Sequence, residues 1–160
     1  VSGLVSPPED QVAVVEATID DMNPQIFGHF QEKALTAGAL DVYFTPIQMK
    51  KGRPAIELTM ICALEQLDLL TRLVFKETST IGIRYTIAKR KTLEREFQRV
   101  HTDYGDVTIK IALLDGRPVN FVPEFEDCRR LATDKGVPLK EVLSAAAHAY
   151  LQRKKSEDVG

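Results

Sequence analysis

The order of apolar segments over residues 1–90 is the feature that most limits how this chain can fold. Segments rich in β-branched and aromatic residues predict strands, whereas apolar residues that recur every three or four positions predict helices. The expected elements are a strand over 12–19, a helix over 25–37, strands over 40–49 and 55–63, a helix over 65–76 and a strand over 83–89. This β-α-β-β-α-β order is that of the ferredoxin-like unit.

A different pattern follows and predicts a second, smaller part. The turn Asp103-Tyr104-Gly105-Asp106 lies between two apolar segments and is typical of a β-hairpin. The remaining expected elements are strands over 93–101, 107–114 and 118–122, and helices over 126–135 and 139–153. The expected fold class is therefore α+β, in which a ferredoxin-like unit precedes a hairpin-plus-helices subdomain.

These elements give the expected domain boundaries. The ferredoxin-like unit, which we expect to bind nucleotide and metal, covers residues 12–90, and the β-hairpin plus two-helix subdomain covers 91–154. Residues 1–11, which include two adjacent prolines, are expected to form a linker. Residues 155–160 are expected to be a frayed tail. Since the chain starts at Val1 and has no secretory signal, we expect it to be a piece of a longer, cytoplasmic protein.

Composition excludes several classes of function. The formal net charge of −2 gives no sign of nucleic-acid binding or of a polybasic membrane-binding surface. No apolar run is long enough to span a bilayer. The two cysteines, Cys62 and Cys128, are far apart and lack a CxxC partner, which fits a reducing compartment better than a zinc site or a disulfide framework.

Two adjacent carboxylates, Asp20 and Asp21, lie where the first expected strand gives way to a helix. Carboxylate oxygens are the ligands that Mg²⁺ and Mn²⁺ prefer, so the pair is a candidate metal site. Helix capping is the alternative, with Asp21 or Asn23 as N-cap and Pro24 at the first helical position. Capping accounts for one of these residues and leaves the pair unexplained.

The expected topology brings this acidic pair close to two other polar segments. In an antiparallel β-α-β-β-α-β sheet, segments 18–23, 49–54 and 77–84 all lie at one edge. They supply carboxylates, the cations Lys50, Lys51 and Arg53, and a third group made up of Thr78, Ser79, Thr80 and Arg84. Carboxylates hold a metal ion, cations neutralise phosphate oxygens, and hydroxyl and turn N–H groups complete a phosphate cradle. A solvated turn and helix-end caps are the alternatives for the second and third segments.

A fourth polar cluster lies near the start of the first helix of the smaller part. Its members are Glu126, Asp127, Arg129 and Arg130, with Cys128 between them. The acids could bind metal and the arginines phosphate. Alternatively, the acids favour a helix N-terminus through its dipole, the arginines are surface residues, and the cysteine is a buried apolar residue.

Four segments, TIDDMNPQ, AGALDVYFTPIQMKKGRP, FKETSTIGIR and PEFEDCRRLA, occur in this order. Together they resemble the C-terminal domain of the LarC nickel-insertion proteins, and the resemblance covers nearly all of residues 12–153. The family's N-terminal region, which includes a histidine-rich stretch, is absent from this sequence.

The resemblance implies a CTP-dependent nickel chelatase or cyclometallase of the lyase class. Such an enzyme inserts its substrate Ni²⁺ into pyridinium-3,5-bisthiocarboxylic acid mononucleotide and completes the nickel-pincer cofactor that lactate racemase receives. CTP is hydrolysed to CMP and pyrophosphate with Mn²⁺ or Mg²⁺. The implied partners are these ligands, the N-terminal region of the same protein and lactate racemase as the recipient of the cofactor. Association of identical subunits is a further possibility that the sequence leaves open, and the charge and apolar pattern predict neither a nucleic-acid nor a membrane partner.

The family also implies roles for individual residues. Asp20 and Asp21 would hold the metal, while Lys50, Lys51 and Arg53 would bind the phosphates. The cradle would be completed by Thr78, Ser79, Thr80 and Arg84. The second-rank candidates, for metal or for the far end of a ligand, are Glu126, Asp127, Arg129 and Arg130. The sequence identifies neither a catalytic base nor the groups that read cytosine. A nucleotide-sensing regulatory module or an oligomerisation module without catalysis of its own is the alternative function.

Overall fold

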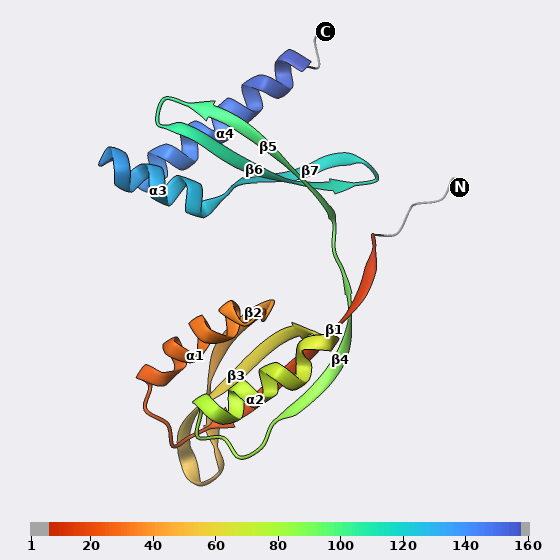
Figure 1. Cartoon of the computed structure of the whole chain (residues 1–160), viewed down its shortest axis with the longest axis vertical. Coiled ribbons are helices and arrows are strands. Elements are labelled where there is room, and N and C mark those ends of the chain that lie inside the picture. The colour runs from red at the N-terminus through yellow and green to blue at the C-terminus, as the bar shows by residue number, and fades with distance from the viewer. Residues whose placement is uncertain (1–6, 158–160) are drawn as a thin grey trace. The chain divides into compact units, whose positions relative to one another are not determined.

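The computed structural model describes the backbone of residues 7–157 and the side chains of residues 7–154. The chain forms two compact units, one over residues 9–91 and the other over the remaining described residues (Figure 1). Each unit has its own hydrophobic core. The α+β class expected from the sequence is confirmed, since both units combine helices with antiparallel strands.

The first unit has the element order expected from the sequence. Its elements are β1 (Glu9–Ile19), α1 (Gln25–Thr36), β2 (Asp41–Met49), a 3-10 turn η1 (Lys50–Gly52), β3 (Arg53–Ala63), a 3-10 turn η2 (Leu64–Gln66), α2 (Leu67–Glu77) and β4 (Arg84–Lys91). The strands form one antiparallel sheet in the order β2-β3-β1-β4, which is the ferredoxin-like order. Pro46 lies in β2 at an edge of this sheet, where a missing backbone N–H is tolerated.

Alternation along the strands decides which face of this sheet is buried. In β1, Val15 and Ala17 are buried and lie opposite Met60 and Leu58 of β3. Because side chains alternate across a strand, these residues share one face, which packs against the apolar stripes of both helices. The other face carries polar side chains such as Glu16, so both helices of this unit lie on the same side of its sheet.

The strand β1 begins earlier than the sequence predicts, which corrects the end of the expected linker. Residues 9–11 lie in β1 and pair with β4, with Glu9 opposite Lys91 and Asp10 opposite Arg90. Arg90 forms a two-point ion pair with Asp10, at 3.0 Å from Nε and 2.5 Å from Nη2. Cross-strand charge pairs stabilise this polar strand end, although its sequence resembles a loop. Residues 1–6 of the expected linker lie outside the described part.

The second unit contains the predicted hairpin, third strand and two helices. Its elements are β5 (Glu94–Thr102), β6 (Gly105–Leu114), β7 (Arg117–Pro123), α3 (Phe125–Lys135) and α4 (Leu139–Glu157), and its strands form an antiparallel sheet in the order β5-β6-β7. Val107, Ile109 and Ile111 of β6 are buried in its core with both helices. The expected frayed tail is helical over residues 155–157, because α4 continues to Glu157, and residues 158–160 lie outside the description. Among the described helices, none combines the length and apolarity needed to cross a membrane.

Candidate functional site

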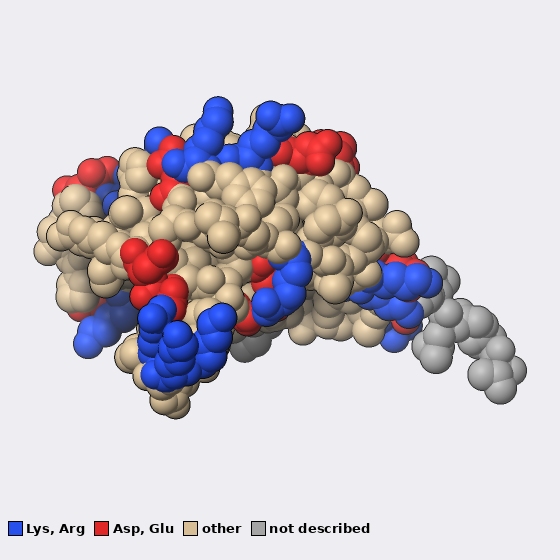
Figure 2. All heavy atoms as spheres, turned by 90° about the horizontal axis from the view of Figure 1, so that it is seen from below, with Lys and Arg blue, Asp and Glu red and all other residues tan. Residues whose placement is uncertain are grey.

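The three polar segments of the first unit meet at one end of its sheet, as the sequence predicts. Arg53 at the start of β3 pairs with Asp20 at the end of β1, with 3.2 Å between Nη1 and Oδ2. Ser79, after α2, donates a hydrogen bond from its Oγ to Asp21 Oδ1 at 2.5 Å. We call this end, formed by residues 18–23, 49–54 and 77–84, the polar end of the sheet. A view from below shows basic side chains gathered with acidic ones beside them (Figure 2).

The two adjacent aspartates have different partners, and neither caps helix α1. The side chain that meets the start of the helix is that of Asn23, whose Oδ1 accepts the backbone N–H of Gln25 at 3.0 Å. Pro24 stands just before the first helical residue. Asp21 instead contacts Ser79, and Asp20 contacts Arg53. Capping therefore does not account for the acidic pair, and both carboxylates face the segments that bring hydroxyl and guanidinium groups.

The β2–β3 turn presents two free cations. Lys50 and Lys51 are exposed, and neither forms an ion pair within the described part of the chain. Lys51 adopts the left-handed conformation, with φ of 62° and ψ of 21°, which disfavours residues that carry a Cβ. A strained lysine with an unengaged ammonium group is unusual for a simple turn, where glycine would be the favoured residue.

Arg84 is held on the open face of the sheet by two glutamates, which its place in the sequence does not predict. Its Nε lies 3.0 Å from Glu16 Oε2, and its Nη2 lies 2.5 Å from Glu57 Oε2. The hydrogen bond to Glu57 and, to a smaller extent, the one to Glu16 raise the pKa of the guanidinium above its ordinary value. The sequence signal for these partners is a glutamate inside each of two otherwise apolar strands, VVEATI and AIELTM.

The loop between α2 and β4 uses two of its three hydroxyl groups to build itself. Thr78 Oγ1 donates to the carbonyl of Val74 at 2.8 Å and accepts the N–H of Thr80 at 3.3 Å. Thr80 Oγ1 donates to the carbonyl of Gly82 at 2.8 Å. Both threonines therefore have local structural roles, and Ser79 is the hydroxyl directed at an aspartate.

The start of this loop is fixed to the neighbouring helix by Glu77. Its Oε1 lies 2.9 Å from Lys33 Nζ, and its Oε2 lies 3.5 Å from His29 Nε2. The hydrogen bond from Lys33 is the largest of the contributions that lower the pKa of the Glu77 carboxyl. This contact joins the last turn of α2 to α1 and so helps to position the loop that carries Ser79.

An apolar hollow adjoins the polar end between α1 and the strands. Its volume is about 350 Å³. Its walls include Phe27 and Phe44, whose rings meet edge to face with centroids 5.1 Å apart, and Asp20 contributes to its lining. A hollow with apolar walls and a charged group among its lining residues can accept a flat ring beside a polar substituent.

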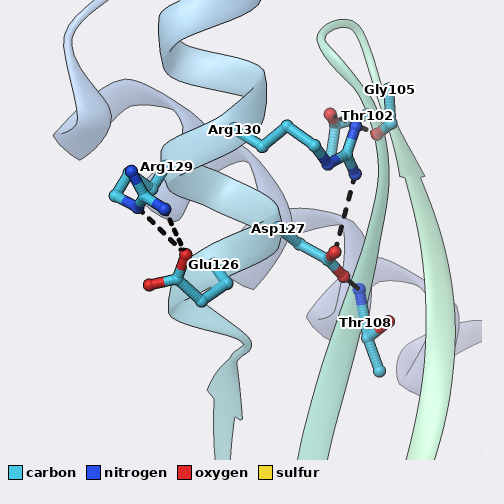
Figure 3. Close-up of polar contacts among 7 residues, drawn as sticks. All are labelled: Thr102, Gly105, Thr108, Glu126, Asp127, Arg129 and Arg130. Atoms are coloured by element: carbon cyan, nitrogen blue, oxygen red, sulfur yellow. Dashed lines mark hydrogen bonds and ion pairs between the residues drawn. The ribbon is translucent and has the colours of Figure 1, made fainter. Parts of the chain in front are cut away.

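The fourth polar cluster lies in the second unit, where its acidic and basic side chains contact one another and the neighbouring strand β6 (Figure 3). Asp127 Oδ2 accepts the backbone N–H of Thr108 at 2.9 Å, where β6 extends beyond the end of β7, and this bond is the main reason that the pKa of Asp127 is lowered. Arg130 lies 3.5 Å from Asp127, and Arg129 makes two bonds to Glu126 at 3.0 and 2.6 Å. These contacts give Asp127 a structural role.

The two cysteines are buried and are not joined to each other. Cys62 and Cys128 are free thiols buried in separate cores, and burial raises the pKa of both. The prediction that Cys128 is a buried apolar residue is confirmed.

Within the described residues, no three His, Cys, Asp or Glu side chains lie close enough together to hold a metal ion. A metal at the polar end would therefore need ligands from a bound molecule or from water.

The sequence places these features in a known family. The profile of the family described as nickel insertion protein matches residues 4–143. The chain belongs to this family. A pyridinium-3,5-bisthiocarboxylic acid mononucleotide nickel insertion protein from Thermotoga sp. (strain RQ2) is 43% identical over 144 residues, which are 89% of this chain and 36% of the relative. A putative nickel insertion protein from Pelobacter propionicus is 48% identical over 134 residues, 84% of this chain and 34% of the relative. The chain thus spans about a third of the length of these relatives.

A solved structure matches this family member over most of its length. LarC2, the C-terminal domain of a cyclometallase involved in the synthesis of the NPN cofactor of lactate racemase, is similar in its apo form, with a TM-score of 0.84 and 43% identity. The match covers 89% of this chain and 99% of that chain. A protein from Methanopyrus kandleri shares the fold alone, with a TM-score of 0.65 and 22% identity.

Proposed function

We propose that this chain is the CTP-binding part of an enzyme that inserts Ni²⁺ into pyridinium-3,5-bisthiocarboxylic acid mononucleotide. The similarity to nickel insertion proteins and to LarC2 supports this activity for the longer protein. The observation that carries the nucleotide part is the position of Lys50 and Lys51, which have no ion-pair partner in the described part of the chain, at the same end of the sheet as Asp21. Binding of a triphosphate requires cations and hydroxyls for its oxygens and a carboxylate for its metal ion.

The residues at the polar end fit a divalent cation that arrives with the nucleotide. In nucleotide sites, Mg²⁺ and Mn²⁺ are held by one or two carboxylates together with phosphate oxygens and water. When bound, such an ion neutralises part of the charge of the phosphates. Asp21 is the leading ligand, because only its Oδ1 is engaged, by Ser79, among the residues that the structure describes. Asp20 is a weaker candidate, since Arg53 already neutralises it.

The cations at this end divide into free and engaged groups. Lys50 and Lys51 would bind the outer phosphates as point charges. Ser79, positioned by the contact with Asp21, would donate to a phosphate oxygen once a metal replaces it at the carboxylate. Arg53 and Arg84 would have to leave Asp20 and the two glutamates, respectively, before they could contact phosphate. Water would attack the α-phosphorus, with pyrophosphate as leaving group.

Calorimetric titration with CTP, UTP, ATP and GTP, with and without Mn²⁺, tests this proposal. Metal-dependent binding of CTP in preference to the other three supports it. Asp21→Asn should weaken this binding, whereas Asp68→Asn, an exposed control on α2, should not. If none of the four nucleotides binds in the presence of Mn²⁺, the nucleotide site is not in this chain. CTP binding without hydrolysis, even with the rest of the protein present, would favour a regulatory module.

A further inference from the structure

The sheet of the second unit has two faces of different character. The helices α3 and α4 pack on the face that carries Val107, Ile109 and Ile111 of β6. Because side chains alternate along a strand, the residues between these three point to the opposite face. We call this opposite face, which is formed by the outward-pointing residues of β5, β6 and β7, the outer face of the second unit.

One exposed aromatic side chain, Phe97, stands on this outer face. Phe97 lies opposite Lys110, which lies opposite Val122, so the three residues form a row across the sheet. The side chain of Phe97 is 60% exposed. Within the described strands β5, β6 and β7, it is the only aromatic residue that points outward, since Phe121 lies opposite Ile111 and packs against the core.

Two arginines without ion-pair partners flank this ring. Arg95 and Arg99 lie two residues before and two residues after Phe97 in β5, so their side chains leave the strand on the same face. Strand geometry places each of them about 7 Å from Phe97 along the strand. Both are exposed, and neither guanidinium forms an ion pair or a hydrogen bond within the described part of the chain.

The other charged groups of the outer face already have partners. Lys110 pairs with Glu124 at 3.1 Å, and His101 Nδ1 lies 2.8 Å from Asp106 Oδ1. The two arginines beside Phe97 are therefore the cations of this face that remain available to a ligand. An exposed ring with a guanidinium on each side suits an aromatic ligand that carries two anionic groups.

We propose that the outer face of the second unit binds the pyridinium-3,5-bisthiocarboxylic acid mononucleotide. Its ring would stack on Phe97, where the positive charge of a pyridinium is attracted to the face of the aromatic ring. Its two thiocarboxylates, at ring positions 3 and 5, lie on opposite sides of the ring and would contact Arg95 and Arg99. This inference rests on the proposed function, because it assigns the substrate of that enzyme to a site in this chain.

This arrangement also leaves the substrate open to nickel. A thiocarboxylate can offer its oxygen to a guanidinium while its sulfur, the softer ligand, stays available to Ni²⁺. Stacking covers one face of the pyridinium ring and leaves the ring edge between the two thiocarboxylates uncovered.

The number of aromatic residues favours a mononucleotide over single-stranded RNA. Sheets that bind RNA stack about two or three bases on successive aromatic residues. The outer face offers one ring among its described strands, which is a platform for one base or one pyridinium. The formal net charge of −2 also disfavours a polyanion.

Calorimetric titration with three pyridinium mononucleotides tests the ligand chemistry. The bisthiocarboxylate carries two anionic ring substituents, nicotinic acid mononucleotide carries one, and nicotinamide mononucleotide carries none. Affinity should fall in this order, by at least about threefold at each step, because each step removes one charged contact with an arginine. Equal affinity for the three compounds would overturn the inference.

Substitutions on the outer face test the location of the site. Phe97→Ala should weaken binding of the bisthiocarboxylate by at least about fivefold, since stacking on an aromatic side chain is lost. Arg95→Gln and Arg99→Gln should each weaken it by at least about threefold. Phe75→Ala and Arg72→Gln, at exposed positions on α2, are the matched controls and should leave it unchanged. Circular dichroism verifies that all five variants fold.

Titration of the same variants with CTP and Mn²⁺ separates this inference from the proposed function. CTP binding that persists in Phe97→Ala, while binding of the bisthiocarboxylate is weakened, supports the inference. If CTP binds but the bisthiocarboxylate does not, or if Phe97→Ala binds the bisthiocarboxylate as well as wild type does, the inference is wrong and the nucleotide site stands. Failure of CTP to bind counts against the nucleotide site and not against the outer face. An oligouridylate that binds more tightly than the bisthiocarboxylate would assign the face to RNA and overturn the inference.

Discussion

Ser79 Oγ lies 2.5 Å from Asp21 Oδ1, although 58 residues separate them in the sequence. This contact ties the loop before β4 to the end of β1. Asp20, the adjacent residue, makes its contact with Arg53 at the start of β3 instead. One carboxylate of the acidic pair thus contacts a hydroxyl and the other contacts a guanidinium. We therefore expect substitutions of the two aspartates to differ in their effect on metal-dependent binding of CTP.

Asp21→Asn should lower the affinity for CTP in Mn²⁺ by at least about tenfold, because an amide is a poor ligand for a hard cation. Asp20→Asn should have a smaller effect, since Arg53 already balances its charge. Titration calorimetry with and without Mn²⁺ separates the metal-dependent part of binding. Equal losses for both variants would mean that the aspartates act as a pair, contrary to the assignment made from their contacts.

Two substitutions at Lys51 separate the backbone of the turn from the charge. Glycine tolerates the left-handed conformation, so Lys51→Gly should increase the free energy of unfolding by about 0.5–1 kcal/mol, while Lys51→Ala should change it little. Both variants lose the ammonium group and should weaken triphosphate binding to the same extent. Urea unfolding and calorimetry measure the two effects. Unchanged CTP binding in both would show that Lys51 serves the turn and not a phosphate.

The sequence predicted the elements of the first unit well, because their periodicities and turn residues are local signals. The ion pairs were less accessible. Glu16 and Glu57 reach Arg84 across separations of 68 and 27 residues, and only the strand register brings the three together. Asp127 remains a predicted metal ligand, and the sequence does not predict its backbone partner, because the bond from the Thr108 N–H forms only where β6 extends beyond the end of β7. Local composition cannot show such a contact.

Gly105 occupies a position where a side chain would collide with helix α3. Its φ is 133°, and an added Cβ would meet Leu131 Cδ2 at 2.9 Å. Gly105→Ala should therefore lower the free energy of unfolding of the second unit by about 2–3 kcal/mol, from backbone strain and overpacking together. Gly116→Ala is the matched control, because its φ is also positive, at 72°, but nothing lies within 4 Å. It should cost about 1 kcal/mol. If urea unfolding gave equal losses in the free energy of unfolding for the two variants, the contact with Leu131 would not be the cause.

The carboxylate of Asp127 should stabilise the second unit in a pH-dependent way. Its pKa is lowered in the folded chain, chiefly by the N–H of Thr108, so the folded state favours the ionised form. The stabilisation is complete above the ordinary pKa near 3.8 and disappears as pH falls through the lower folded value. At pH 7, Asp127→Asn should cost about 1–2 kcal/mol, and the difference from wild type should shrink below about pH 4. Glu126→Gln, at a side chain that is 71% exposed, should change stability little. Thermal unfolding from pH 2 to 7 measures both, and a pH-independent loss in Asp127→Asn would contradict the role of the charge.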